Sequence, residues 1–150
     1  QDNYSGGDSR IDAHYQRLGI GGQWTNYSLR IDQEVLSSNN GQYAFQTPLG
    51  TNHLFQGWAD QFLTTPRQGI RDTYLSGSVK IEKAQLLAEY HEFDSDFGNI
   101  DFGKELDFSV SYPLMTKLLG KIEYADYNAG DATSGKTDLR RIWVTLMYNY

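Results

Sequence analysis

Apolar and polar side chains alternate along most of this chain, with the period of two that is typical of β-strands. Successive side chains of a strand point to opposite faces of a sheet, so this pattern places one set on each face. The clearest case is the terminal segment, in which Ile142, Val144, Leu146 and Tyr148 alternate with Arg141, Thr145 and their neighbours. The chain is therefore predicted to be all-β.

Seven segments show this alternation, and Gly, Pro, Asn or Asp residues lie in most of the links between them. In residues 104–114, for example, Leu106 and Val110 fall on one face and Glu105 and Asp107 on the other. The predicted strands are residues 11–16, 27–35, 71–82, 84–93, 104–114, 116–127 and 141–150.

Alternation alone does not separate a soluble sandwich from a membrane barrel, but the connections favour the barrel. Tight links are expected at Gly19–Gly22, Glu82–Lys83 and Pro113–Thr116, and longer ones at 37–70, 94–103 and 128–138. Outer-membrane barrels have short periplasmic turns and long extracellular loops. If Tyr150 ends in the periplasm, all the short links fall on the periplasmic side. We therefore predict a transmembrane antiparallel up-and-down β-barrel.

Composition excludes several other classes of protein. No stretch approaches the ~18 to 20 consecutive apolar residues of a membrane-spanning helix, and the mean hydropathy is -0.60. Barrel strands look hydrophilic on average, so this value leaves a barrel open. The formal net charge of -6 and the absence of cysteine argue against a nucleic-acid partner, a disulfide framework and a thiolate metal site.

The number of predicted strands suggests a larger barrel. Seven strands put the two ends of the chain on opposite sides, whereas bacterial single-chain barrels have an even number of strands. We therefore interpret residues 1–150 as the C-terminal portion of one outer-membrane barrel domain, with residues 38–70 as a long extracellular or pore loop.

Several segments resemble the alginate-export-like family of outer-membrane barrels of Gram-negative bacteria. The likeness is most specific in QYAFQTPLGTNHLFQGWADQFLTTP at 42–66, followed by GIRDTYLSGSVKI, and continues in LLAEYHEFDSDFG, FGKELDFSVSYPL, LLGKIEYADYNAGD and RRIWVTLMYNY. It covers about Gln42 to Tyr150, with a weaker match from Ser9 to Ser37. The resemblance implies a channel or porin for small hydrophilic, often anionic, solutes.

The terminal segment also looks like the signal read by the barrel-assembly machinery. Aromatic Tyr148 and Tyr150 follow apolar residues at alternate positions. The segment departs from the usual signal at Thr145, where glycine is common, and at Trp143, where a polar residue is usual. Outer-membrane lipid and this machinery are thus the expected partners, and a homo-oligomer is left open.

Charged residues on the polar faces are the candidates for lining a pore. Fixed charges set the selectivity of a pore, but cross-strand ion pairs that stabilise the wall are as common. We favour ion pairs for most of them, with the basic residues as the better candidates for contact with anions. The candidates are Arg30, Asp32, Lys80, Glu89, Glu105, Asp107, Lys121, Glu123 and Arg141.

The long connection is expected to have a structure of its own. Its apolar residues recur at roughly helical spacing after Thr51 and Asn52, which predicts a short amphipathic helix ended by Pro66. The segment either narrows the pore or packs on the rim. The constriction candidates are Phe45, Phe55, Trp58 and Phe62.

Neither metal nor catalytic spacing stands out in the sequence. Acidic loop residues such as Asp94, Asp96 and Asp101 fit no EF-hand loop and are interpreted as solvated. Ser76 or Ser78 beside His91 lacks a nucleophile motif, so no enzyme and no cofactor are expected. The competing functions are a soluble β-barrel or sandwich that binds a ligand, and a structural sleeve around another component.

Overall fold

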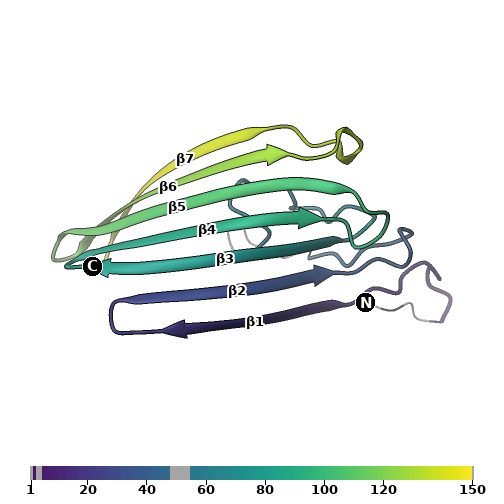
Figure 1. Ribbon diagram of the computed structural model, residues 1–150, viewed down its shortest axis with the longest axis horizontal. Coiled ribbons are helices and arrows are strands. Elements are labelled where there is room, and N and C mark those ends of the chain that lie inside the picture. Colours follow the sequence, from purple (N-terminus) through teal and green to yellow (C-terminus); the bar gives the residue numbers. More distant parts are fainter. Residues whose placement is uncertain (1, 3–4, 48–54, 150) are drawn as a thin grey trace.

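The computed structural model describes residues 2, 5–47 and 55–149. In this part of the chain, seven antiparallel strands form one up-and-down sheet in sequence order (Figure 1). The strands are β1 (Tyr15–Gln23), β2 (Tyr27–Leu36), β3 (Ile70–Ile81), β4 (Ala84–Asp94), β5 (Asp101–Met115), β6 (Leu118–Ala129) and β7 (Leu139–Tyr148). The all-β prediction is confirmed.

Short and long connections alternate as predicted. The links at 24–26, 82–83 and 116–117 gather at one end of the sheet, and those at 37–69, 95–100 and 130–138 at the other (Figure 1). A 3-10 turn, η1 (Ala132–Ser134), lies in the last long link. Among the described residues, no helix has the length and apolar character needed to cross a membrane.

In a soluble sandwich the apolar face of a sheet is buried and its polar face is exposed to water. Over much of this sheet the exposure of the two faces is reversed. On β5, Glu105 and Asp107 are 1% and 0% exposed, whereas Leu106 between them is 50% exposed. At the C-terminal end of the sheet, Leu146 and Tyr148 are 67% and 63% exposed. The apolar side chains therefore point away from the interior of the molecule, and the charged ones point into it.

The strand register aligns the apolar side chains on one side of the sheet in rows. We call this side the apolar face. One row runs through all strands from β2 to β7 and consists of Tyr27, Val79, Leu86, Val110, Ile122 and Val144. Towards the long connections the same face becomes polar, in a row formed by Gln33, Thr73, Glu92, Lys104 and Asn128.

The opposite side, which we call the polar face, is partly covered by the connection between β2 and β3. An apolar core lies between this connection and the strands near their loop ends. It contains Leu36, Trp58, Ala59, Phe62, Ile70, Phe93, Phe102, Ala125 and Tyr127. The covered part of the polar face is thus the interior of the molecule.

The first strand was predicted at 11–16, with Tyr15 on the apolar face beside Ile11 and Ala13. Both its position and its phase were wrong, because β1 begins at Tyr15 and this side chain lies on the polar face, where it donates to Glu34. The expected turn at Gly19–Gly22 lies within β1, and the true turn is at 24–26. Gly19 and Gly21 leave room for side chains of β2, because a Cβ at either position would lie within 2.5 Å of the side chain of Asp32 or Arg30. These two glycines therefore indicate a close approach of side chains.

The predicted amphipathic helix was also wrong for its described part, residues 55–66, which form turns. Gln56, Gly57 and Asp60 have φ values of 54°, 80° and 57°, which interrupt a right-handed helix. The amides of Trp58 and Ala59 bond to carboxylates of β5. Thr51, Asn52 and Leu54 lie outside the described residues.

The sheet has two open edges in the described part of the chain. Its strand order runs from β1 at one edge to β7 at the other, without pairing between the two. Each edge therefore presents unpaired backbone groups, which are the usual template for a further strand.

Candidate functional site

All nine predicted pore-lining residues lie on the polar face, because each pairs in register with another residue of that face. Glu89 lies opposite Asp107, and Lys121 opposite Ser111. Eight of them belong to ion pairs or lie under the β2–β3 connection, as described below. Lys80 lies near the turn end of β3, opposite Gln85, and is exposed.

The charges near the first two strands form an ion-paired group around Asp32. Its carboxylate accepts hydrogen bonds from Arg30 at 2.8 Å and from Arg17 at 3.2 Å. Arg17 escaped the sequence prediction because the phase of the first strand was wrong. Asp32 is 2% exposed, whereas the side chains of both arginines are partly exposed. Its buried carboxylate thus holds two guanidinium groups that reach solvent.

Two further ion pairs lie near the other edge. On β6, Lys121 Nζ lies 2.6 Å from a Glu123 oxygen. On β7, Arg141 donates to Asp60 of the β2–β3 connection at 2.8 Å. Five of the nine candidates therefore belong to ion pairs: Arg30 with Asp32, Lys121 with Glu123, and Arg141 with Asp60. The first two of these pairs lie within one strand, whereas the prediction was for pairs across strands.

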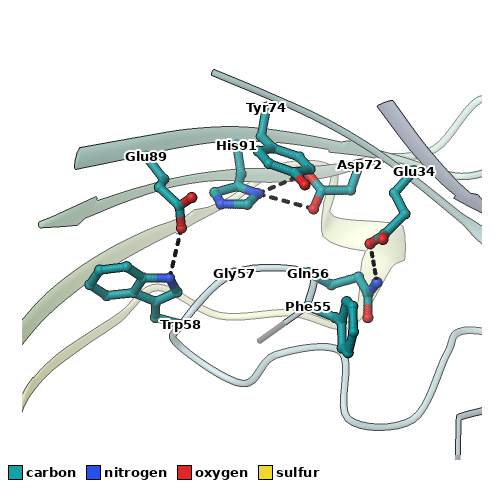
Figure 2. Close-up of a pocket in the computed structure, with 9 residues that line it drawn as sticks. All are labelled: Glu34, Phe55, Gln56, Gly57, Trp58, Asp72, Tyr74, Glu89 and His91. Carbon is teal, nitrogen blue, oxygen red and sulfur yellow. Dashed lines mark hydrogen bonds and ion pairs between the residues drawn. The ribbon is translucent and has the colours of Figure 1, made fainter. Parts of the chain in front are cut away.

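Residues 55–65, which we call the covering segment, bind the polar face through hydrogen bonds. Gln56 donates to Glu34 at 2.7 Å, and the Trp58 indole N–H donates to Glu89 at 2.9 Å (Figure 2). The Ala59 amide donates to Glu105 at 2.6 Å. Charged side chains of β2, β4 and β5 thus hold one short piece of chain against the sheet.

The four predicted constriction residues take different places. Trp58 and Phe62 are buried in the core under the covering segment. Phe45 is partly buried against that core, with its ring centroid 6.0 Å from that of Tyr15. Phe55 is 42% exposed and borders a small cavity together with Trp58 (Figure 2).

The last long link also contacts the covering segment. The ammonium group of Lys136 donates to the Gln61 carbonyl oxygen and lies 4.6 Å from the centroid of the Phe62 ring. Partial burial lowers the pKa of Lys136 below its usual value. The segment is therefore held from the β6–β7 link as well as from the sheet.

A buried group of ionisable side chains lies on β3, β4 and β5 beneath Trp58. His91 Nδ1 lies 2.9 Å from an Asp72 oxygen, and His91 Nε2 lies 3.7 Å from an Asp107 oxygen. The His91 ring also stacks on Tyr74, with centroids 4.8 Å apart. The grouping of His91 with these acids was not predicted, because they come from three different strands.

Comparison with protein-family models, curated proteins and solved structures found no match to this chain. The resemblance to the alginate-export-like family therefore stays a prediction. A functional proposal for this chain therefore depends on how apolar and charged side chains are distributed over the two faces of the sheet.

The acidic loop residues hold neighbouring loops and strand ends together in the described structure. Asp96 accepts the amide of Ser38 at 2.9 Å, and Asp131 accepts the amide of Asp101 at 3.0 Å. Asp126, at the loop end of the apolar face, pairs with Arg140 at 3.1 Å. Such hydrogen bonds and ion pairs are common for carboxylates in loops and at strand ends.

The pairing of Ser76 or Ser78 with His91, considered and set aside from the sequence, does not form among the described residues. Ser78 bonds to Ser28 at 2.8 Å, and Ser76 lies opposite Glu89 in the register. Within the described residues, His91 Nε2 has no hydrogen-bond partner of any kind. The arrangement gives no support to a serine hydrolase.

Proposed function

We propose that this chain forms part of the wall of an outer-membrane β-barrel that lets small hydrophilic solutes diffuse across the membrane. The apolar face would contact lipid, and the polar face would line the lumen. The single observation that carries the proposal is the inverted sheet, with exposed apolar side chains on one face and buried charges on the other. A large exposed apolar surface marks a membrane or protein contact.

The height of the apolar face fits a membrane crossing. On β5 it runs from Leu106 through Phe108, Val110 and Tyr112 to Leu114, which is a span of residues 106–114. A transmembrane strand needs about 9 to 11 residues to cross the hydrocarbon core. The apolar part of β5 is therefore about as long as a crossing requires.

Tyrosines border this apolar band at the loop end, where an interface is expected. Tyr90 donates its hydroxyl to Glu92 at 3.2 Å, and Tyr124 donates to Asp126 at 3.0 Å. Each tyrosine thus turns its polar tip towards the polar row and leaves its ring beside the apolar rows. Amphipathic aromatic residues gather at both interfaces of membrane barrels.

Aromatic residues also lie at the turn end of the sheet. Trp24 and Tyr27 stack with ring centroids 4.7 Å apart at the β1–β2 turn, and both are exposed. Tyr112 and Tyr148 are exposed on strands β5 and β7, which flank β6. This second group supports the same placement in a bilayer. Tyr150, the other expected terminal aromatic, lies outside the described residues.

A barrel closes the edges of its sheet, since unpaired backbone groups are not tolerated in lipid. Further strands, beyond the seven described, would pair with β1 and β7. The sheet also curves around the covering segment. Gln56 contacts β2 and Asp60, four residues later, contacts β7, although these strands would be about 24 Å apart in a flat sheet. This curvature supports closure into a barrel.

The covering segment would narrow the lumen near its loop end. Its position over the polar face, anchored to Glu34, Glu89 and Glu105, supports this role. Acidic side chains outnumber basic ones on the described polar face, so its charge gives no support to the expected preference for anions. The proposed solutes are therefore small and hydrophilic, without a stated sign of charge.

The test combines membrane fractionation with planar-bilayer recording of the purified full-length protein. We expect the protein to stay in the outer-membrane fraction after alkaline carbonate washing and to give discrete conductance steps. A protein that is released by the wash, or that purifies without detergent, would contradict the proposal and favour a soluble ligand-binding barrel. Tight membrane insertion without conductance would favour a structural sleeve.

A further inference from the structure

Three side chains of β4 and β5 bring ligand atoms of one type of site together. Glu89 and His91 are two residues apart on the polar face of β4, and Asp107 lies opposite Glu89 on β5. One carboxylate oxygen of each acid and a ring nitrogen of His91 all lie within 4.8 Å of one another. Figure 2 shows the His91 ring between the carboxylates of Asp72 and Glu89.

A buried nitrogen without a partner lies at this point, beside two carboxyl groups. In the described part of the chain, His91 Nε2 is buried and makes no hydrogen bond. The buried carboxyl groups of Glu105 and Asp107 beside it contact each other, with no hydrogen bond to a cationic side chain among the described residues. His91 is 4% exposed and Asp107 is 0% exposed. A buried nitrogen without a partner costs free energy and is uncommon in folded proteins, so His91 Nε2 beside two carboxyl groups points to a bound group.

The position of Asp72 prepares His91 to act as a ligand. Its carboxylate lies 2.9 Å from His91 Nδ1, so this nitrogen carries the proton and the lone pair of Nε2 faces Glu89 and Asp107. A carboxylate behind the distal nitrogen of a histidine is the usual support for metal-ligating histidines. Asp72 is therefore placed as a positioning residue.

We propose that Glu89, His91 and Asp107 bind one divalent transition-metal ion of the Zn²⁺ type beneath Trp58. An imidazole nitrogen with carboxylate oxygens suits Zn²⁺ and its neighbours in the series, whereas Mg²⁺ and Ca²⁺ prefer oxygen ligands throughout. Four-coordinate Zn²⁺ at ~2.1 Å from each ligand holds ligand atoms about 3.4 Å apart. The ligand atoms of the three groups, which lie within 4.8 Å of one another, would close to this spacing around the ion.

The surroundings provide room for the remaining coordination position. A cavity of about 40 Å³ borders Glu89, His91 and Asp72. A water molecule needs roughly 10 to 15 Å³ of such space, so one fits as the fourth ligand. The ion would also offset the negative charge of neighbouring carboxylates that have no arginine or lysine bound to them among the described contacts.

The same site connects to the covering segment. Trp58 donates its indole N–H to Glu89, and its backbone amide lies 3.4 Å from an Asp107 oxygen. A metal that fixes these two carboxylates would fix the segment against the sheet. The inference goes beyond the transport proposal and is independent of it, because it depends on contacts among described residues and not on a pore.

The test is metal titration of the full-length protein in detergent after removal of divalent ions with EDTA. Zn²⁺ is added and followed by calorimetry, and Co²⁺ is added in parallel and followed by its visible absorption bands. We expect one ion per chain, Co²⁺ bands typical of nitrogen and oxygen ligation, and no displacement by excess Mg²⁺. Folded protein that shows no saturable binding of Zn²⁺ would overturn the proposal.

Variants separate this site from other histidines. His91→Gln and Glu89→Gln should each weaken Zn²⁺ binding by more than tenfold, and Asp72→Asn by about 10- to 100-fold. His14→Gln, at an exposed histidine outside the group, is the matched control and should bind as the parent does. Glu89 is only partly buried, so Glu89→Gln keeps the test decisive if His91→Gln fails to fold. Unchanged affinity in folded His91→Gln or Glu89→Gln would contradict the assignment.

Discussion

A single arginine on the apolar face distinguishes a membrane barrel from a soluble sheet. Val144 lies in the middle of the apolar band, in the row of Val110, which is the third of the five apolar positions of β5. Its side chain is 72% exposed. If that face is in water, Val144→Arg removes little packing and should change the free energy of unfolding by no more than about 0.5 kcal/mol.

If the face is in lipid, the same substitution places a charge near the bilayer midplane. The expected cost is about 2 to 4 kcal/mol. Thr145→Arg is the matched control, since it adds the same side chain to the other face of β7. Lys121 lies opposite Thr145, and the repulsion between the two cations adds up to about 1 kcal/mol. The two outcomes therefore remain separable.

The assay is equilibrium unfolding in guanidinium chloride of protein folded into phospholipid vesicles, followed by tryptophan fluorescence. We expect Val144→Arg to be less stable than Thr145→Arg by at least about 1 kcal/mol. Leu106→Arg, at the edge of the band beside Asp126, should cost only about 0 to 1 kcal/mol. Equal stabilities for the Val144 and Thr145 variants would refute the assignment of the two faces.

Three further predictions concern the lumen and the loops. Trp58→Ala empties a buried site, so it should lower the free energy of unfolding by about 3 to 5 kcal/mol and raise single-channel conductance, whereas Trp24→Ala at the exposed turn should leave conductance unchanged. Asp32→Asn frees two arginines from their ion pairs, so reversal potentials should shift towards anions; a constant reversal potential would exclude these arginines from the pore. Gly103→Ala should lower the free energy of unfolding by about 1 to 3 kcal/mol, because φ is 112° and a Cβ would lie 2.2 Å from a backbone oxygen. The control is Gly98→Ala, where φ is 98° but the space is open, and thermal melting should show a smaller loss of stability for it.

The sequence predicted the parts of the fold that depend on local alternation. The faces of β5 and β7 follow directly from the residues, because every second side chain is apolar over a long span. The order of short and long links followed from turn residues such as those at 82–83. In β1 the same method failed, because its glycines were read as a turn although they make space for Asp32 and Arg30.

The candidate metal site was not predictable from spacing along the chain. Its ligands come from two strands, and their alignment depends on the register across the 95–100 link, where the pairing shifts between Phe93 and Asp94. The covering segment was predicted to have a structure of its own, and two of its aromatic residues, Trp58 and Phe62, are buried beneath it. Its path was missed, because three left-handed residues turn it away from a helix and towards the carboxylates of β5.

The environment of neighbouring side chains on β7 tests the central claim most directly. The chain has no cysteine, so single cysteines at 144, 145 and 146 can each carry a spin label in protein reconstituted into vesicles. We predict that labels at 144 and 146 collide with oxygen dissolved in lipid and are shielded from a water-soluble nickel complex, with the reverse at 145. Labels at 144 and 146 that are as accessible to the nickel complex as the label at 145 would contradict the account.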